Sequence, residues 1–294
     1  MLISIIICTR NRAESLKGTL ESALSIKTDN QNTIELIVVN NNSTDHTDKV
    51  ILEYQKKFNG RLIGVSQKKR GLSNARNAGI NQSKGDVLAF TDDDCLIHED
   101  WVIKLSSKFN NDDQLMGVLG NAIWEDGSPM YSEDSLFRGN GLNMSFRKNV
   151  FMQIGLFDPH LGAGAVGFSA EDLDFITRIV DRNLKIAIFN DVLVTHKHRI
   201  SPEEQSQIFF RDSKGQAIFL LKYLIYKGQI KRLRKLLSIV RYNFITLIQA
   251  KKEKNERWAS EKYLRLKGTC LGAITGVFIW LILVPWERLT NHGD

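Results

Sequence analysis

Apolar runs of strand length alternate with helix-period segments over the first ninety residues. The β-branched run from Leu2 to Cys8 is typical of a strand buried on both faces, and Ile34 to Val39 repeats the pattern. Between them, Leu16, Leu20 and Leu24 recur at helical spacing. This alternation predicts an α/β fold with a largely parallel sheet covered by helices.

The other expected elements continue this alternation. Thr44 or Asp45 can cap the second helix, because the side-chain oxygen of either residue can accept a hydrogen bond from the first helical amides. A glycine-rich loop spans residues 155–167. We expect helices at 13–25, 45–58, 72–80 and 170–181, and strands at 61–65, 87–90, 185–189 and 192–195.

Candidate chemistry lies at the carboxyl ends of the predicted strands, where parallel sheets bind ligands. Asp92, Asp93 and Asp94 follow the strand at 87–90. Adjacent carboxylates repel one another unless a cation lies among them. Mg²⁺ or Mn²⁺, with phosphate oxygens completing the shell, suits such ligands. The alternative is a solvated acidic turn or a helix cap.

Two helix starts carry residues suited to phosphate binding and proton transfer. Arg76 and Asn77, in the segment from Gly71 to Gly79, can contact a pyrophosphate. The alternative is an ordinary helix with a surface arginine. Glu171 and Asp172 open a helix where a carboxylate can take a proton from an attacking hydroxyl. The alternative is favourable placement of acidic residues at a helix N-terminus.

A histidine and two tryptophans complete the candidates. His196 follows a strand, so it is a candidate metal ligand or phosphate contact, or else a hydrogen-bonded structural histidine. Trp101 and Trp124 can stack on a sugar ring, and buried aromatic residues explain them equally well.

Positive charge is concentrated in the C-terminal third of the chain. The net charge is +7, and residues 201–267 alone carry 16 Lys and Arg against six Asp and Glu. The first 200 residues are nearly neutral, which argues against a nucleic-acid binder. Residues 207–226 and 230–250 have the apolar stripes of helices.

Residues 268–285 contain no charged side chain over 18 positions, near the lower limit for a spanning helix. Gly268, Gly272 and Gly276 would permit close helix packing in lipid. As a membrane element, this segment would insert while the basic helices lie on anionic headgroups, keeping the first 200 residues on the cytoplasmic face. As a soluble element, the helices would pack on the first 200 residues or form a homodimer.

Taken in order, the motifs of the first 200 residues resemble family 2 glycosyltransferases of the GT-A fold. Several motifs in the right order are far more specific than any one of them. The matching segments are Ser4–Arg12, Glu35–Asp45, Gly71–Gly79, Phe90–Asp94, Gly141–Arg147, Gly155–Asp158 and Glu171–Asp172.

The resemblance implies a role for matching positions. Asp172 would be the catalytic base, and Glu171 would help to hold the acceptor. Asp94 is the first choice as metal ligand, with Asp92 beside it. The expected donor contacts are Thr9, Arg12, Asn40, Arg76, Asn77, Asp92 and Asp93, and the expected acceptor contacts are Trp101, Trp124 and Asn143.

Two departures from the family pattern refine these expectations. Asn40 stands where the family usually has an Asp that accepts a hydrogen bond from the uracil N–H, so the base of the donor stays open. Processive polymerases of the family carry a Gln-rich motif ending in Arg-Trp after the catalytic acid. Here Gln205–Arg211 is followed by Asp212, so we expect one sugar to be added at a time.

The expected function is therefore metal-dependent, inverting transfer of one sugar from a nucleotide-diphosphate donor to an acceptor hydroxyl. The acceptor would be a glycan or lipid-linked glycan in polysaccharide or glycolipid assembly. The alternative is a non-catalytic nucleotide- or glycan-binding scaffold of the same fold. A dinucleotide-binding oxidoreductase or a sugar-nucleotide pyrophosphorylase would need a Gly-rich turn after the first strand, and Cys8–Ala13 contains no glycine.

These expectations divide the chain into four segments. The expected catalytic domain covers 1–200, with a donor half at about 1–95 and an acceptor half at about 96–200. Basic amphipathic helices would occupy 201–267, the apolar membrane segment 268–285, and a short tail 286–294.

Overall fold

The computed structural model describes residues 1–130, 141–197 and 201–284, which divide into two compact units. The first unit comprises 1–157 and 172–199, and the second comprises 158–171 and 200–294. The loop at 158–171 therefore groups with the C-terminal helices, and the chain crosses between the units three times.

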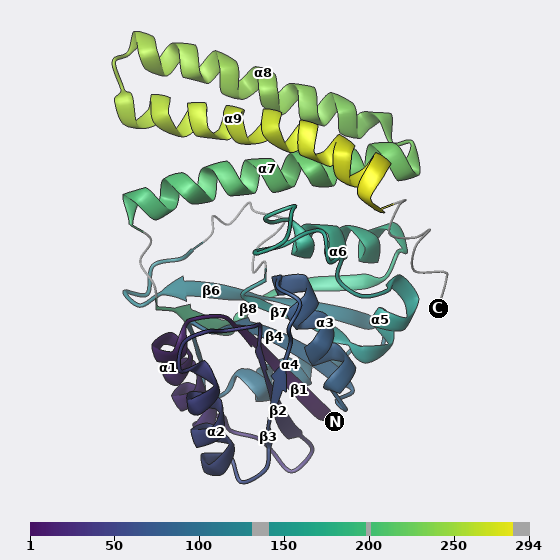
Figure 1. The fold of residues 1–294 in the computed structure, drawn as a ribbon. Coiled ribbons are helices and arrows are strands. Elements are labelled where there is room, and N and C mark those ends of the chain that lie inside the picture. Colours follow the sequence, from purple (N-terminus) through teal and green to yellow (C-terminus); the bar gives the residue numbers. More distant parts are fainter. Residues whose placement is uncertain (131–140, 198–200, 285–294) are drawn as a thin grey trace. The chain divides into compact units, whose positions relative to one another are not determined.

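A mixed sheet of eight described strands forms the centre of the first unit (Figure 1). The strand order is β3-β2-β1-β4-β7-β6-β8-β5. The first four strands pair in parallel, as the alternating pattern predicted, whereas β7 runs antiparallel to both β4 and β6. The strands are β1 (Leu2–Thr9), β2 (Thr33–Asn40), β3 (Leu62–Ser66), β4 (Val87–Asp92), β5 (Cys95–Ile97), β6 (Leu115–Trp124), β7 (Asn143–Arg147) and β8 (Lys185–His196).

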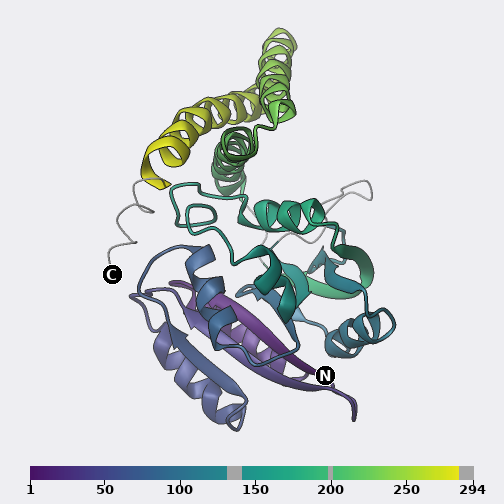
Figure 2. The same cartoon turned by 90° about the vertical axis from the view of Figure 1, so that its right-hand side faces the viewer.

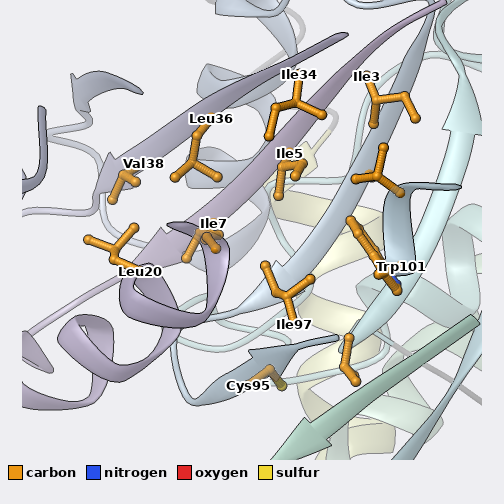
Figure 3. Close-up of a cluster of buried hydrophobic side chains, with 14 of the residues drawn as sticks. Ile3, Ile5, Ile7, Leu20, Ile34, Leu36, Val38, Cys95, Ile97 and Trp101 are labelled. Atoms are coloured by element: carbon orange, nitrogen blue, oxygen red, sulfur yellow. The ribbon is translucent and has the colours of Figure 1, made fainter. Parts of the chain in front are cut away.

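Helices cover both faces of this sheet because its central strands are apolar on both sides. In β1, Ile3, Ile5 and Ile7 belong to one hydrophobic cluster, and Ile6 belongs to another. Figure 3 shows side chains of β1 and β2 in the first cluster, with Leu20 of α1 beside them. The helices are α1 (Ala13–Leu24), α2 (Thr47–Lys57), α3 (Leu72–Gln82), α4 (Trp101–Asn110), α5 (Lys148–Ile154) and α6 (Glu171–Asp181).

The start of α2 differs from its prediction. The helix begins at Thr47, and neither Thr44 nor Asp45 occupies its N-cap position. The Asp45 carboxylate instead accepts hydrogen bonds from the Thr47 amide at 3.1 Å and from the Ala13 amide at 3.2 Å. Asp45 therefore links the loops that follow β1 and β2.

The two strands predicted at 185–189 and 192–195 form the single strand β8. Its pairing with β6 passes from Gly120–Phe189 to Asn121–Leu193, so three residues of β8 are accommodated as an irregularity. A bulge of this kind interrupts the side-chain alternation without ending the strand, so the sequence pattern alone predicts two strands.

Long helices make up most of the described second unit, and Figure 1 shows them running alongside one another. Figure 2 shows the same helices after a turn of 90°. α9 packs against both α7 and α8. At the start of α7, Ser201 and Glu204 form a capping box, in which each side chain accepts a hydrogen bond from the amide of the other residue. The elements are α7 (Pro202–Lys227), α8 (Ile230–Lys252), α9 (Glu256–Phe278) and the π-helical turn η1 (Ile279–Leu283).

The apolar segment predicted at 268–285 is not a separate helix. Its described residues form the second half of α9 and η1, continuous with a first half that carries basic residues. The continuous helix Glu256–Leu283 is long and apolar enough to cross a membrane.

Candidate active site

The acidic run lies between β4 and β5, at the carboxyl ends of the parallel strands. Asp92 ends β4, and Asp93 and Asp94 form the turn that follows. Arg12, from the loop after β1, contacts Asp93 Oδ1 at 2.8 Å and Asp94 Oδ2 at 2.9 Å. Both of these carboxylates are buried, whereas the Arg12 side chain is 43% exposed. Burial raises the pKa of Asp93, against the opposing effect of Arg12.

Strand pairing brings His196 to the same carboxylates. Cys95 of β5 pairs antiparallel with His196, the last residue of β8. The buried His196 ring has Nε2 at 3.4 Å from Asp94 Oδ1, and Trp124 packs edge-on against it with ring centroids 5.3 Å apart. Asp94 therefore faces Arg12 with one oxygen and His196 with the other.

Gly141 connects the acidic run to the candidate base on α6. Its N–H donates to Asp172 Oδ2 at 3.0 Å, and its carbonyl accepts from Arg76 Nη2 at 3.3 Å. The buried Arg76 guanidinium also lies 3.8 Å from Asp92 Oδ1. A Cβ at residue 141 would overlap Arg76 Nη2, so a larger residue here would displace the Arg76 guanidinium. Gly141 opens one of the matching segments but has no predicted role of its own, and the structure shows that it links residues far apart in the chain.

A buried ion pair fixes the first turns of α6. Asp174 is fully buried and accepts from Arg178 Nε at 2.9 Å. Arg178 also donates to the carbonyls of Ile154 and Leu156, at 2.6 Å and 2.9 Å. The helix is thereby tied to the end of α5, and Asp172 is held by the Gly141 amide and by the amide of its own following residue.

Asparagine side chains organise the loop after β2. Asn40 donates to Asp48 Oδ1 at 2.6 Å and accepts from the backbone amide three residues later at 3.0 Å. Asn41 donates to the Lys69 carbonyl and accepts from the Gly71 amide, each at 2.8 Å. Asn41 therefore holds the start of α3 against this loop, a role that only the run of consecutive asparagines could have signalled.

Asn77 has a structural role, and its expected donor contact stays a prediction. Its amide nitrogen donates to the Phe157 carbonyl at 2.8 Å, and its oxygen accepts from the Phe157 amide at 2.9 Å. This paired contact resembles one rung of a β-ladder, and it holds the chain at Phe157 against α3.

Trp101 and Asn143 are core residues, which corrects the expectation that they contact the acceptor. Trp101 is fully buried, and its indole N–H donates to Asn143 Oδ1 at 3.1 Å. Asn143 in turn donates to the carbonyls of Asn121 and Val192, each at 2.9 Å. Both side chains are used inside the sheet, so neither reaches a sugar outside it.

Three further residues were expected to contact the donor or the acceptor. Thr9 is buried at the end of β1, Glu171 is buried at the start of α6, and Trp124 is half-buried beside His196. The donor contact of Thr9 and the acceptor contacts of Glu171 and Trp124 stay predictions.

The residues around Asp94 fit part of a divalent metal site. Across the described ranges, no three Asp, Glu, His or Cys side chains converge as a complete protein site. Asp94 Oδ1 and His196 Nε2, 3.4 Å apart, are close to the separation of about 3 Å between neighbouring ligands of an octahedral ion with bonds of about 2.1 Å. Two protein ligands plus phosphate oxygens is a common arrangement for Mg²⁺, and imidazole is also accepted by transition metals.

Comparison with known proteins adds a family to this geometry. The family model described as glycosyl transferase family 2 matches residues 4–170, more than half of the chain. Glycosyltransferase AglE of Haloferax volcanii is 27% identical over 73% of this chain and 72% of its own length. A glucosyl-dolichyl phosphate glucuronosyltransferase of the same organism is 25% identical over 67% of this chain and 69% of its own length.

Solved structures share the fold at low sequence identity. The mannosyltransferase PcManGT from Pyrobaculum calidifontis, in complex with GDP-Man and Mn²⁺, superposes with a TM-score of 0.64 at 14% identity, covering 94% of this chain and 87% of its own. S. aureus TarS 1-349 in complex with UDP-GlcNAc gives a TM-score of 0.54 at 16% identity, covering 92% and 91%.

Proposed function

The chain belongs to glycosyl transferase family 2 and has the GT-A fold, and from that premise we propose that it transfers one sugar at a time, with inversion. The donor is a nucleotide-diphosphate sugar, and the acceptor is a hydroxyl or phosphate oxygen of a lipid-linked substrate. Two relatives of the chain are named as glycosyltransferases, which favours catalysis over the scaffold alternative.

The observation that carries the proposal is the row Asp92–Arg76–Gly141–Asp172. Through Gly141, this row links a carboxylate held by backbone amides to a buried cation beside the acidic run. A base near a diphosphate site is the arrangement that a single displacement needs, since attack and departure occur on opposite sides of one carbon.

In the proposed reaction, the acceptor oxygen forms a bond to the anomeric carbon as the bond from that carbon to the diphosphate oxygen breaks. When the acceptor is a hydroxyl, Asp172 receives its proton. An ionised phosphate oxygen has no proton to lose, so with that acceptor Asp172 would not act as a base. Arg12, exposed at the mouth of the acidic turn, and Arg76, beside Asp92, supply positive charge near the diphosphate. Mn²⁺ or Mg²⁺, held by Asp94 with Asp92 or His196, would stabilise negative charge on the leaving diphosphate.

The proposed acceptor is a lipid-linked sugar or polyprenyl phosphate at the cytoplasmic face of a membrane. One relative is a glucosyl-dolichyl phosphate glucuronosyltransferase, which by its name acts on a lipid phosphate sugar. The apolar second half of α9 supports a site of action next to lipid. The base of the donor is left to experiment, because Asn40 is engaged by its own loop.

The test is a transfer assay with the full chain, a panel of GDP- and UDP-sugars, Mn²⁺, and polyprenyl phosphate or its monoglycosylated form in vesicles. We expect one donor to give a glycolipid heavier by one sugar, with the anomeric configuration inverted by NMR. Donor binding without transfer to any acceptor, and without donor hydrolysis, would favour the scaffold instead. Products longer by several sugars would contradict single addition.

A further inference from the structure

α9 uses its glycine stripe inside the protein, against α7. A Cβ on Gly268 would overlap the Phe210 carbonyl, and one on Gly272 would overlap the Lys214 carbonyl. A Cβ on Gly276 would lie 2.9 Å from the Leu221 side chain. The close packing that the glycines predicted is therefore present, but its partner is a helix of this chain.

The opposite face of α9 and η1 is apolar and open. Ile274 is 70% exposed, and its neighbours at spacings of three and four residues are exposed as well. From Gly268 to Val284 the helix contains no charged residue. Soluble monomers rarely leave an apolar stripe of this length in water. We call it the α9 stripe: Leu271, Ile274, Val277, Phe278, Leu281 and Ile282.

α8 presents a second open face in which apolar and basic residues alternate. Ile230, Leu237 and Phe244 recur every seven residues and are each more than half exposed. Arg234 and Arg241 lie between them on the same side of the helix and are also exposed. α8 holds seven Lys and Arg and no Asp or Glu. A helix of this composition suits an anionic lipid interface, where the apolar side chains enter and the cations meet headgroups.

Charge decides between a lipid surface and a second copy of the chain. A symmetric dimer through the exposed face of α8 would place this helix, whose charged residues are all basic, against its copy. Repulsion between like charges opposes such an interface. An anionic bilayer complements both the apolar stripe and the basic helix.

The contact with α7 also decides how α9 meets the bilayer. A spanning α9 would either lose its glycine contact or draw α7 into the hydrocarbon. α7 carries Asp212, Lys214 and Lys222, and ionised groups at that depth are strongly unfavourable.

We infer that the second unit docks on an anionic phospholipid surface through the α9 stripe and the exposed face of α8, with α9 lying in the interface without spanning the bilayer. α7 keeps the glycine face of α9 and stays on the aqueous side. The inference does not depend on which sugar is transferred, because none of these residues belongs to the candidate active site.

Vesicle flotation of the full chain tests the surface. We expect flotation with vesicles containing phosphatidylglycerol and much less with phosphatidylcholine alone. The double variant Ile274→Glu, Phe278→Glu should lose at least about tenfold in vesicle affinity, since it places two charges in the apolar face. Leu52→Glu, on an exposed apolar residue of α2, is the matched control and should float like the wild type.

The basic face has its own variant. Arg234→Glu with Arg241→Glu should remove most of the preference for phosphatidylglycerol, a loss of about tenfold or more, and the remaining binding should respond less to salt. Unchanged flotation in both double variants would overturn the inference. A soluble wild-type dimer that both variants split, with no vesicle binding, would assign the face to a second copy instead.

A label on Cys270, which is exposed at the edge of the α9 stripe, measures how deeply α9 enters the bilayer. A fluorophore on this thiol should be quenched by lipids spin-labelled near the headgroup, and alkaline carbonate should release the bound chain. Quenching from the bilayer centre together with resistance to carbonate would mean that α9 spans. Cys270→Ser controls for labelling of Cys8 and Cys95.

Discussion

The two units of the chain place charge and apolar surface in opposite ways. At the sheet edge of the first unit, Asp93, Asp94 and Arg76 are buried, and the apolar side chains around them are covered. Along α8 and α9 of the second unit, cations are exposed and so are large apolar residues such as Ile274.

Each arrangement is unfavourable unless it is compensated, by charged partners in the first unit and by a covering surface in the second. Burying charge loses hydration, so groups that stay buried and ionised need partners and commonly mark chemistry. Exposing an apolar stripe leaves it in water, so it marks a surface that another phase covers. The contrast separates a region shaped for a charged small molecule from a region shaped for lipid.

Removing the charge of Asp94 should produce the largest change among the variants that break this contrast. Asp94→Asn keeps the side-chain size, but takes away the carboxylate that faces both Arg12 and His196. We expect sugar transfer at saturating Mn²⁺ to fall about 10²- to 10³-fold, as for loss of one preorganised electrostatic group. The measurement is initial rate against Mn²⁺ concentration. Asp113→Asn, at a fully exposed carboxylate, should behave like the wild type.

Filling the space at Gly141 tests the connection between the acidic run and Asp172. In Gly141→Ala the new methyl group displaces the Arg76 guanidinium. A displacement of about 1 Å at a reacting group can lower the rate by up to about 100-fold, so we expect a fall of about 10- to 100-fold in kcat. Gly18→Ala, in α1, controls for a general effect of losing a glycine, because the added Cβ meets only the flexible end of the Lys197 side chain. Equal activity of the two variants would remove Gly141 from the account.

Most charges on α8 and α9 of the second unit are exposed, but this unit also contains a buried ion pair. Lys222 Nζ lies 2.7 Å from Asp158 Oδ2, and both side chains are mostly buried. Removing one partner leaves a buried charge, so Lys222→Met should lower the free energy of unfolding by about 2–3 kcal/mol. Urea denaturation of the full chain measures it.

The same pair should make stability depend on pH. Partial desolvation tends to raise the pKa of Asp158, but hydrogen bonding to His160 and the charge of Lys222 hold it well below its usual value. A depressed folded-state pKa stabilises the fold above the unfolded value of about 3.9, and this stability is lost as pH falls below it. Wild-type stability should therefore drop on acidification below about pH 4, and Lys222→Met should flatten that drop. An unchanged slope would contradict the assignment.

An exposed pair should matter least. Lys104 of α4 and Asp100, the N-cap residue before that helix, form an i,i+4 contact at 2.7 Å, with both side chains at least one third exposed. Lys104→Met should change the free energy of unfolding by no more than about 0.5 kcal/mol. A loss as large as that of Lys222→Met would show that burial does not distinguish the two pairs.

The local patterns of the sequence were enough for the first half of the fold. Alternation of apolar runs located β1 to β4 and α1 to α3, and the polar residues after those strands did meet at one sheet edge. These features depend on neighbours along the chain, where periodicity is informative.

Other features depend on distant pairings. The sequence names His196 as a candidate ligand beside Asp94, but only the register of β5 and β8 shows how the two meet. The contact of Gly141 with Arg76, across 65 positions, has no local signal. Composition does not distinguish a buried tryptophan from one that stacks on sugar, and only the fold shows that Trp101 is the buried kind. The glycine stripe of α9 signalled close packing, but the sequence could not identify α7 as the partner.

The most direct test of sugar transfer by this site is Asp172→Asn, measured by transfer rate and donor affinity on the same preparation. The account predicts a fall of about 10³-fold in transfer, as for loss of a general base, with the donor Kd within about twofold of the wild type. Asp181→Asn, at the other end of α6, should change neither value. Near wild-type transfer by Asp172→Asn would contradict the assignment of the base.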